Sequence, residues 1–232
     1  MMQFVKILVI LIVLTVNSLA HKSIYIWSKS FEEYSNNEIL STLKNNNIDI
    51  AIISFHKSQT DKFKDILNKD IKIIPLISDN NLIYPKNRNK LDEKIKFLSQ
   101  FSNEIHLDIE PHALPELKHN RELYFKLYIQ MLKYLKEKYP NIKIDISIPT
   151  FYYKIPNLDK YANKLYIMAY ENPKSLIKRI SRFDKSSFIA QNCKEFHSKN
   201  ELKEIFDIIN QNGYKNIAYH SYKTCKRFLD DK

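Results

Sequence analysis

The sequence predicts a single α/β domain, because short strand-like runs alternate with longer amphipathic segments along the chain. Eight such runs are present, rich in Ile and other β-branched or aromatic residues. The chain has one glycine, Gly213, near its C-terminal end, so it lacks the glycine-rich turn that usually follows the first strand of an open doubly wound sheet. Eight strands with intervening helices and no such turn predict a compact single-domain (β/α)₈ TIM barrel over residues 21–232.

The elements follow in a regular order. The expected strands are Ser23–Trp27, Asp49–Phe55, Ile71–Ile77, Glu104–Glu110, Lys143–Pro149, Lys164–Tyr170, Ser186–Asn192 and Asn216–Tyr222. The expected helical segments are Phe31–Asn45, Gln59–Asn68, Leu91–Phe101, Arg121–Tyr139, a short piece at Leu158–Ala162, Pro173–Ser181 and Lys199–Gln211. No internal repeat, linker or second domain interrupts this order.

Residues 1–20, MMQFVKILVILIVLTVNSLA, are predicted to be a signal peptide. Lys6 precedes an apolar run from Ile7 to Val16, and the small residues Ser18 and Ala20 frame a cleavage site after Ala20. The run is short for a membrane span, so no stable membrane insertion is expected after cleavage. We therefore expect a secreted or periplasmic protein, with a retained N-terminal anchor as the alternative.

The chain is basic, with a formal net charge of +11 that falls to +10 without Lys6 of the leader. A basic balance is compatible with nucleic acid, an anionic membrane or an acidic substrate. Here the Lys residues are scattered among Glu and Asp, and no block of five or more like charges occurs. The pattern indicates a solvated basic surface, and no nucleic-acid partner is predicted.

Two cysteines, Cys193 and Cys225, occur in the chain. In an exported protein an even number of cysteines permits a disulfide, although sequence alone does not show that the two meet. No Cys-x-x-Cys or Cys/His spacing indicates a zinc site. The sequence predicts no metal and no cofactor.

The stretch EIHLDIEPH, residues 104–112, is the most informative part of the sequence. His106, Asp108 and Glu110 alternate with three aliphatic residues, so the three polar side chains should share one face of the expected fourth strand. Two carboxylates on one face of a buried strand carry a large desolvation cost. Because the active site of a (β/α)₈ barrel lies at the carboxyl ends of its strands, Asp108 and Glu110 are predicted to be catalytic.

The other strands also end in polar or aromatic residues. A mouth lined by carboxylates, imidazoles and aromatic rings suits a polar ring-shaped ligand such as a sugar. The predicted substrate-binding residues, beside His106, are Trp27, His56, Tyr152, Glu171, Gln191, His220 and Tyr222. Alternatively, Trp27 and Tyr152 cap the barrel core, and His220 is a core histidine.

The spacing of the two carboxylates suits glycosidic cleavage. Two positions along a strand span about 6.5 to 7 Å, and neighbouring like charges push their pKa values apart, so that one group keeps its proton. Cleavage of a glycosidic bond needs a protonated carboxyl beside the leaving oxygen. Glu110, nearer the mouth, is predicted to be this acid, and Asp108 to be an orienting or charge-stabilising partner.

The segments HLDIE and YIMAYE resemble the chitinase-type family 18 glycoside hydrolases, which carry D-x-x-D-x-D-x-E on strand four and Met-x-Tyr-Asp on strand six. The resemblance implies a barrel in which Glu110 is the general acid and Asp108 orients the substrate's own acetamido group as nucleophile. It also implies that the Tyr170 hydroxyl contacts that group, and that Met168 and Glu171 line the floor of the same pocket.

The chain departs from the family pattern around these motifs and keeps the terminal D-x-E. Asn103 and His106 stand where the family has Asp, and Glu104 replaces the usual Gly. Glu171 replaces the Asp of strand six, Pro111 follows the acid where an aromatic residue is common, and the last strand ends in His220 and Tyr222 where chitinases present Trp.

Together these features predict an exported glycan-active barrel that hydrolyses glycosidic bonds in an amino-sugar polymer. One alternative is a catalytically silent glycan-binding barrel, and another is a metal-dependent polysaccharide deacetylase using His106, Asp108, Glu110 and His220. Many retaining glycosidases have the acid on strand four and a nucleophilic Glu on strand seven. Strand seven here offers Gln191, whose amide cannot be that nucleophile, so such a mechanism would need Glu171 as the second carboxylate. No G-x-S-x-G, H-E-x-x-H or P-loop motif is present.

Overall fold

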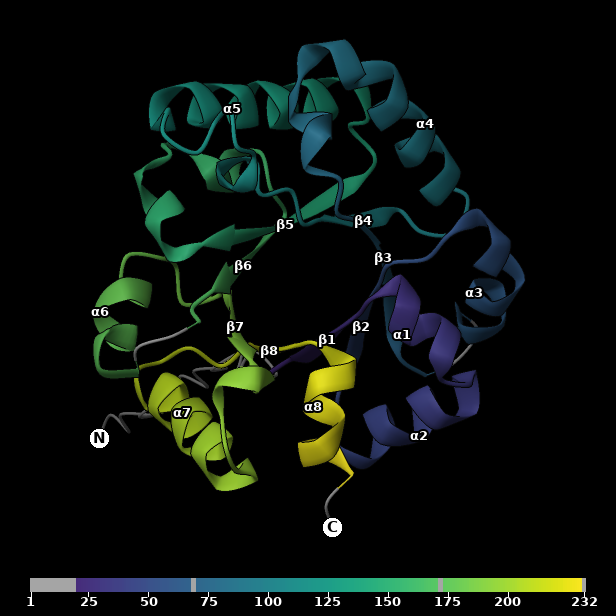
Figure 1. The fold of residues 1–232 in the computed structure, drawn as a ribbon, viewed down its shortest axis with the longest axis vertical. Coiled ribbons are helices and arrows are strands. Elements are labelled where there is room, and N and C mark those ends of the chain that lie inside the picture. Colours follow the sequence, from purple (N-terminus) through teal and green to yellow (C-terminus); the bar gives the residue numbers. More distant parts are fainter. Residues whose placement is uncertain (1–19, 68–69, 171–172, 231–232) are drawn as a thin grey trace, which may run out of the picture.

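The computed structural model describes residues 20–67, 70–170 and 173–230, in which eight parallel strands close into a barrel surrounded by helices (Figure 1). Each strand pairs with the next one in sequence, and β8 pairs with β1. The predicted (β/α)₈ fold is therefore confirmed. The predicted signal peptide lies outside the described residues, except for Ala20.

The elements have the following bounds. The strands are β1 (Lys22–Ile26), β2 (Ile50–Ile53), β3 (Lys72–Ile77), β4 (Glu104–Leu107), β5 (Lys143–Pro149), β6 (Lys164–Met168), β7 (Phe188–Asn192) and β8 (Ile217–His220). The α-helices are α1 (Ser28–Glu33), α2 (Asn36–Asn45), α3 (Thr60–Leu67), α4 (Arg88–Leu98), α5 (Arg121–Lys138), α6 (Leu176–Ile180), α7 (Lys199–Gln211) and α8 (Tyr222–Leu229). The short 3₁₀ helices are η1 (Lys57–Gln59), η2 (Asn80–Ile83), η3 (Pro85–Asn87), η4 (Pro111–Ala113), η5 (Thr150–Lys154), η6 (Leu158–Lys160), η7 (Pro173–Ser175) and η8 (Cys193–Glu195).

Several strands are shorter than predicted, among them β4, which ends at Leu107, and two further differences arise where helices begin. The segment 31–45 is divided between α1 and α2, because the Ser35 hydroxyl accepts a hydrogen bond from the Glu38 amide (3.2 Å) and starts a new helix. The last strand ends at His220, so its predicted extension to Tyr222 was wrong. The amide of Ser221 donates to Thr224 Oγ1 (3.0 Å), which closes the first turn of α8 and makes Tyr222 its first residue.

The core has two layers because successive strand side chains face opposite sides. One apolar cluster fills the barrel and consists of Tyr25, Ile50, Ile52, Ile74, Leu76, Tyr166, Phe188, Ala190 and Ala218. The residues between them belong to a larger cluster that includes residues of the surrounding helices. Ile105, Leu107 and Ile109 belong to that outer cluster, so His106 and Asp108 face the barrel interior, as predicted.

Charged side chains close the barrel at the amino ends of the strands. Both oxygens of Glu104, the first residue of β4, accept hydrogen bonds of 2.7 Å, from Lys72 and from Lys164. Burial opposes ionisation of Glu104, but these lysines outweigh it and lower its pKa. Lys164 also lies 3.8 Å from Asp145, whose second oxygen accepts from Asn163 (3.1 Å). We call these five residues the floor cluster, in which two lysines neutralise Glu104, whereas burial and the charge of Glu104 raise the pKa of Asp145 to about 7.

Lys164→Met should lower the free energy of unfolding by about 2 to 4 kcal/mol, because it leaves buried carboxylates with too few cations. Urea denaturation near neutral pH measures the change. Lys133→Met is the matched control, since Lys133 forms an exposed pair with Glu137 (3.8 Å) and should cost no more than about 0.5 kcal/mol. An equally small loss in both variants would show that the floor cluster contributes no stability.

A disulfide joins Cys193 of η8 to Cys225 of α8, with the two Cα atoms 5.1 Å apart. Both cysteines are fully buried. The bridge closes a loop with a sequence separation of 32 residues, for which chain-entropy arguments give about 3 to 4 kcal/mol of stabilisation. It ties the segment after β7 to the last helix.

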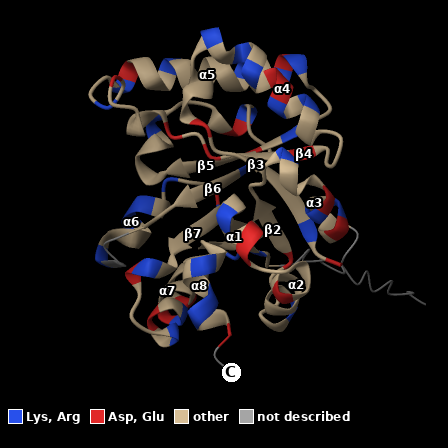
Figure 2. Cartoon of the chain, turned by 45° about the vertical axis from the view of Figure 1, so that its right-hand side comes forward, with Lys and Arg blue, Asp and Glu red and all other residues tan. Residues whose placement is uncertain are grey.

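The surface carries Lys and Arg on many helices, with Asp and Glu interspersed among them (Figure 2). This matches the scattered charge pattern of the sequence. None of the helices in the described ranges has the length and apolar character required to cross a membrane.

Candidate active site

The two predicted catalytic carboxylates follow directly after β4, and the neighbouring strand holds their backbone. The Asp108 amide donates to the carbonyl of Ile77 in β3 (2.8 Å), so pairing continues one residue beyond β4. The Glu110 amide then donates to the side-chain oxygen of Asn80 (2.6 Å) in η2. Pro111 begins η4 and turns the chain away. Both carboxylates therefore stand at the carboxyl end of the barrel on a backbone that β3 and its loop position.

Asp108 and Glu110 differ in depth, in the order that the sequence predicted. Asp108 is 8% exposed, whereas the side chain of Glu110 is 36% exposed. Within the described residues, no Lys or Arg nitrogen lies within 4 Å of either carboxylate, and Oδ1 of Asp108 is buried without a hydrogen-bond partner. Glu110 has only His112 nearby, with 3.7 Å between Oε1 and Nε2. Asp108 is thus buried and Glu110 partly buried, and neither has a neutralising lysine like those of the floor cluster.

This burial has a direct effect on protonation. Burial and the neighbouring charge of Glu110 raise the pKa of Asp108 to about 7, although a hydrogen bond from Ser147 opposes the shift. Burial also raises the pKa of Glu110. Since the two groups interact and both pKa values are raised, the pair tends to retain a proton near neutral pH.

A neutral hydrogen-bonded layer separates Asp108 from the floor cluster. The His106 ring is fully buried, and its Nε2 lies 2.7 Å from the Ser147 hydroxyl and 3.3 Å from the Tyr25 hydroxyl. The two hydroxyls are 2.7 Å apart. Burial lowers the pKa of His106 to about 3, so the imidazole is neutral where the family 18 motif carries an Asp. Ser147 therefore links His106 and Tyr25 to Asp108.

Tyr25 and Ser147 were missed by the sequence prediction. For Ser147 the sequence held a signal, because Asp145 and Ser147 alternate with Ile in β5. His106 and Asp108 alternate with aliphatic residues in the same way. The register pairs His106 with Asp145, which places the polar faces of β4 and β5 side by side.

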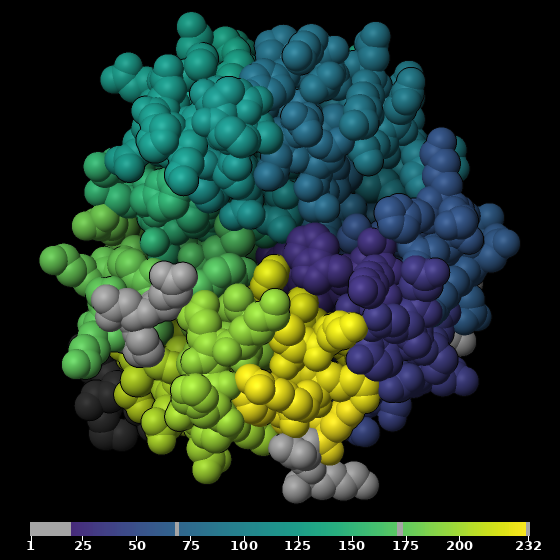
Figure 3. Space-filling model, in the orientation of Figure 1, coloured from purple at the N-terminus to yellow at the C-terminus, as the bar shows by residue number. Residues whose placement is uncertain are grey.

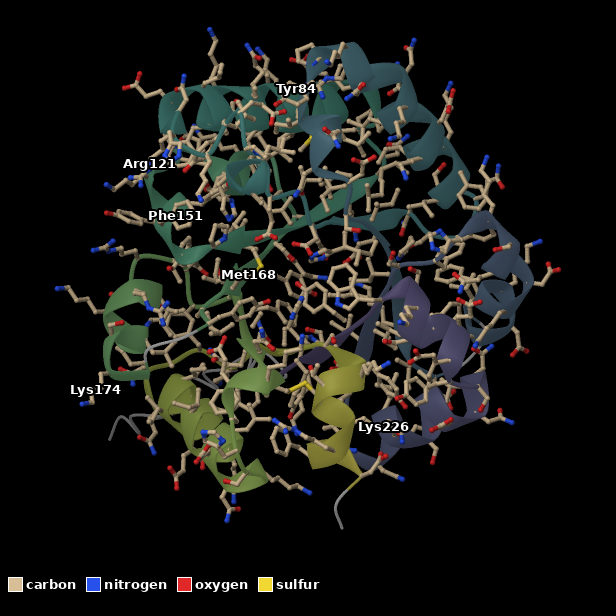
Figure 4. All side chains as sticks on the ribbon, viewed as in Figure 1. Tyr84, Arg121, Phe151, Met168, Lys174 and Lys226 are labelled. Carbon is tan, nitrogen blue, oxygen red and sulfur yellow. A yellow bond between two sulfur atoms is a disulfide. The ribbon has the colours of Figure 1, made fainter. Side chains whose placement is uncertain are left out.

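Aromatic side chains form one wall of the mouth. The His220 ring, at the end of β8, lies 5.6 Å from Trp27 and 5.3 Å from Tyr170 between ring centroids. Burial lowers the pKa of His220 to about 4 and raises that of Tyr170, so both are neutral near pH 7. The Tyr170 hydroxyl is buried without a hydrogen-bond partner, while Met168 lies on the inner side of β6 (Figure 4). The ends of β1, β6 and β8 thus bring together Trp27, Tyr170 and His220.

In the space-filling view, the earliest described part of the chain (purple), its middle (green) and its end (yellow) meet at the centre of this face (Figure 3). This meeting is a consequence of barrel closure, because β8 pairs with β1. It brings Trp27 of the first βα segment next to His220 of the last.

Two predicted binding residues are buried away from the mouth. Tyr152 is fully buried in an aromatic cluster beside α5, and its hydroxyl lies 3.1 Å from Nδ1 of His112. Tyr222 is buried between α8 and α2, where its hydroxyl donates to Thr42 Oγ1 (3.3 Å). Tyr152 thus supports His112, and Tyr222 belongs to the packing around the helices.

Two other predicted residues, Gln191 and His56, do not join the carboxylate pair, and a third, Glu171, is not described. Gln191 is two residues away from Ile189 and from Cys193, which both belong to the outer layer, so its side chain is on the same side. Its amide donates to the carbonyl of Ala169 (3.2 Å). It therefore faces the helices. His56 is exposed and lines a separate cavity of about 470 Å³. Glu171 falls outside the described residues.

No protein-family model matches the sequence, and no curated protein sequence matches it significantly. Solved structures do match. The spore cortex-lytic enzyme SleL from Bacillus cereus aligns with a TM-score of 0.65 and 12% identity, over 91% of this chain and 74% of that chain. The family 18 chitinase from Cycas revoluta, in complex with allosamidin, aligns with a TM-score of 0.58 and 9% identity, over 90% of this chain and 97% of that chain.

This chain shares the (β/α)₈ barrel fold of these enzymes. An endo-β-N-acetylglucosaminidase from Cordyceps militaris shares the fold as well, with a TM-score of 0.53 and 12% identity over 86% of this chain and 81% of that chain. At such low identities the likeness establishes the barrel fold. That fold is the one that the resemblance of the HLDIE and YIMAYE segments implied.

Metal ligation would require several side chains to converge. Across residues 20–67, 70–170 and 173–230, no group of three or more His, Cys, Asp or Glu is arranged to hold a metal ion. In particular, His106 engages Ser147 and Tyr25, and His220 packs against aromatic rings. The ligand set named above for a deacetylase does not form such a group among these residues.

Asp108→Asn should change how stability depends on pH. A carboxyl with a pKa raised from 3.8 to about 7 stabilises the native protein below the lower value, and this contribution is lost as pH rises through the higher one. The wild-type protein should therefore lose up to about 1.4 kcal/mol per pH unit relative to Asp108→Asn within that window. Urea unfolding at several pH values measures the difference.

The control for this experiment is Asp92→Asn. Burial opposes ionisation of Asp92, but hydrogen bonds from Lys138, Tyr134 and Tyr139 lower its pKa. Asp92 therefore stabilises the protein above its unfolded-state pKa, and that contribution is lost as pH falls, which is the opposite sign. A pH-independent difference between wild type and Asp108→Asn would contradict a buried proton on Asp108.

Proposed function

We propose that this protein is an exported glycoside hydrolase that cleaves an amino-sugar polymer, with Glu110 as general acid and Asp108 as orienting carboxylate. The observation that carries the proposal is the contrast among the three acids of one segment. Glu104 is neutralised by two lysines, whereas Asp108 and Glu110 are buried with no Lys or Arg partner among the described residues. A fold gains nothing from such a pair, so a role in chemistry is the better explanation.

Each group suits its role. Glu110 is the more exposed carboxyl, and its raised pKa favours the protonated form that an acid needs. Its proton would pass to the glycosidic oxygen as the bond from that oxygen to the anomeric carbon breaks, with an oxocarbenium-like transition state. Asp108 lies deeper, where it would orient the acetamido group whose carbonyl oxygen attacks the anomeric carbon, as the family 18 resemblance implies.

The remaining mouth residues would bind the sugar. The Tyr170 hydroxyl has no partner in the described structure and would donate to the acetamido oxygen. Trp27 would pack against a sugar ring, and His220 would hold the Trp27 and Tyr170 rings in place. His106 would act indirectly, since Ser147 connects it to Asp108.

The polymer and the location of the protein follow from the same proposal. The signal-peptide pattern of residues 1–20 supports export, and the Cys193–Cys225 disulfide is compatible with an oxidising compartment. The neighbouring structures are named as a cortex-lytic enzyme, a chitinase and an N-acetylglucosaminidase. Peptidoglycan and poly-N-acetylglucosamine are therefore the substrates to test first.

Glu110→Gln should reduce turnover by about 10²-fold or more, because the amide cannot donate the catalytic proton. Its melting temperature should stay close to that of the wild type, since Glu110 has no cation partner to lose among the described residues. Release of reducing ends from peptidoglycan, chitin oligosaccharides and poly-N-acetylglucosamine measures turnover.

Glu122→Gln is the matched control, because Glu122 is exposed at the start of α5 and should leave turnover unchanged. Wild-type cleavage by Glu110→Gln would eliminate Glu110 as the acid. Binding of these glycans by the wild type without any release of reducing ends would instead support the silent glycan-binding barrel.

A further inference from the structure

The cavity that His56 lines lies beside the mouth of the barrel. It has a volume of about 470 Å³ and is bounded by the residues that follow β1, β2 and β3, including Ser28, Ser54 and Ser78, and by α4. Ile77 also lines it, and the carbonyl of Ile77 accepts the hydrogen bond from the Asp108 amide. Ile77 thus borders the cavity and also pairs with the backbone of Asp108.

The lining of this cavity is rich in lysine. Lys57, Lys90 and Lys94 contribute to it, together with the acids Asp79 and Glu93. Lys90 is paired with Asp79 at 2.7 Å, and this hydrogen bond helps to lower the pKa of Asp79 against the effect of burial. The Lys90–Asp79 pair is thus internally neutral.

Lys57 and Lys94 have no acidic partner within 4 Å among the described residues. The ammonium of Lys57 lies 5.7 Å from the centroid of the Phe97 ring, which forms part of the cavity wall. Lys94 is half-buried on α4, where its charge is less well hydrated than at an open surface. Glu93 is exposed and likewise unpaired, so the lining keeps a net positive charge.

The chemistry of the lining indicates its ligand. Ammonium groups attract carboxylate or phosphate, and serine hydroxyls provide further hydrogen bonds to such an anion. The Phe55 and Phe97 rings supply an apolar wall for the carbon skeleton that bears it. A neutral polymer would leave both free lysines without a partner.

We propose that this cavity binds an anionic substituent of the glycan, either a carboxylate or a phosphate, while the sugar backbone lies across Asp108 and Glu110. The inference rests on the proposed function and sharpens it, because it names acidic amino-sugar polymers as the preferred substrates. Lys57 and Lys94 are then residues that determine specificity.

The test measures binding in the Glu110→Gln protein by isothermal titration. The probes are a tetrasaccharide of alternating N-acetylglucosamine and N-acetylmuramic acid, the methyl ester of that tetrasaccharide, and a chitin tetrasaccharide with and without 6-phosphate groups. The carboxylate form should bind about tenfold more tightly than its methyl ester at low salt. The phosphate arm identifies which of the two anions the cavity prefers.

Lys57→Gln combined with Lys94→Gln should abolish the preference for the charged probes and leave the affinity for the neutral ones unchanged. Lys96→Gln is the control, because Lys96 is exposed on the same helix and does not line the cavity. The proposal is overturned if neutral and anionic probes bind equally, if no anionic probe binds, or if the double variant keeps the preference. Because turnover is not measured, a silent wild-type protein would leave this result intact.

Discussion

The burial of carboxylates along one strand segment governs the interior of this barrel. Glu104, Asp108 and Glu110 all follow the inward-facing alternation of β4, with His106 between the first two. An unpaired carboxylate in a dry interior costs too much to persist ionised, so each must acquire a cation or hold a proton. Lysines neutralise Glu104 at the floor, whereas burial and the charge of Glu110 raise the pKa of Asp108 at the mouth to about 7.

A neutral layer separates the floor cluster from the carboxylates at the mouth. His106, Ser147 and Tyr25 are linked through hydrogen bonds, and none carries a charge near neutral pH. An Asp at position 106, as in the family 18 pattern, would place another negative charge below Asp108. The imidazole removes that repulsion, so in this chain burial and Glu110 are the main causes of the raised Asp108 pKa.

The loop after β3 connects the mouth with the neighbouring lysine-lined cavity. Asn80 of that loop accepts from the Glu110 amide, while the adjacent Asp79 anchors Lys90 in the cavity. One short segment therefore contacts both the backbone of Glu110 and a lysine of the cavity wall. An anionic substituent seated beside Lys94 would also orient the sugar backbone relative to Glu110.

The sequence by itself determined the barrel and the position of its carboxylates. Strand alternation depends on local geometry alone, so the inward face of β4 and the depth order of Asp108 and Glu110 could be read from the order of residues. The capping signal of Ser35 is present in the sequence, but the prediction did not divide residues 31–45 there, and it placed no helix after the last strand.

Only the tertiary structure decided which polar residues meet. Gln191 and Tyr222 lie near the ends of expected strands, but neither side chain is at the mouth. Gln191 lies on the outer face of β7, and Tyr222 is the first residue of α8. Tyr152 became part of the packing beneath His112. The Lys164 partnership of Glu104 and the hydroxyl link from His106 to Asp108 join residues on different strands. Such contacts depend on register and barrel closure, which sequence periodicity does not specify.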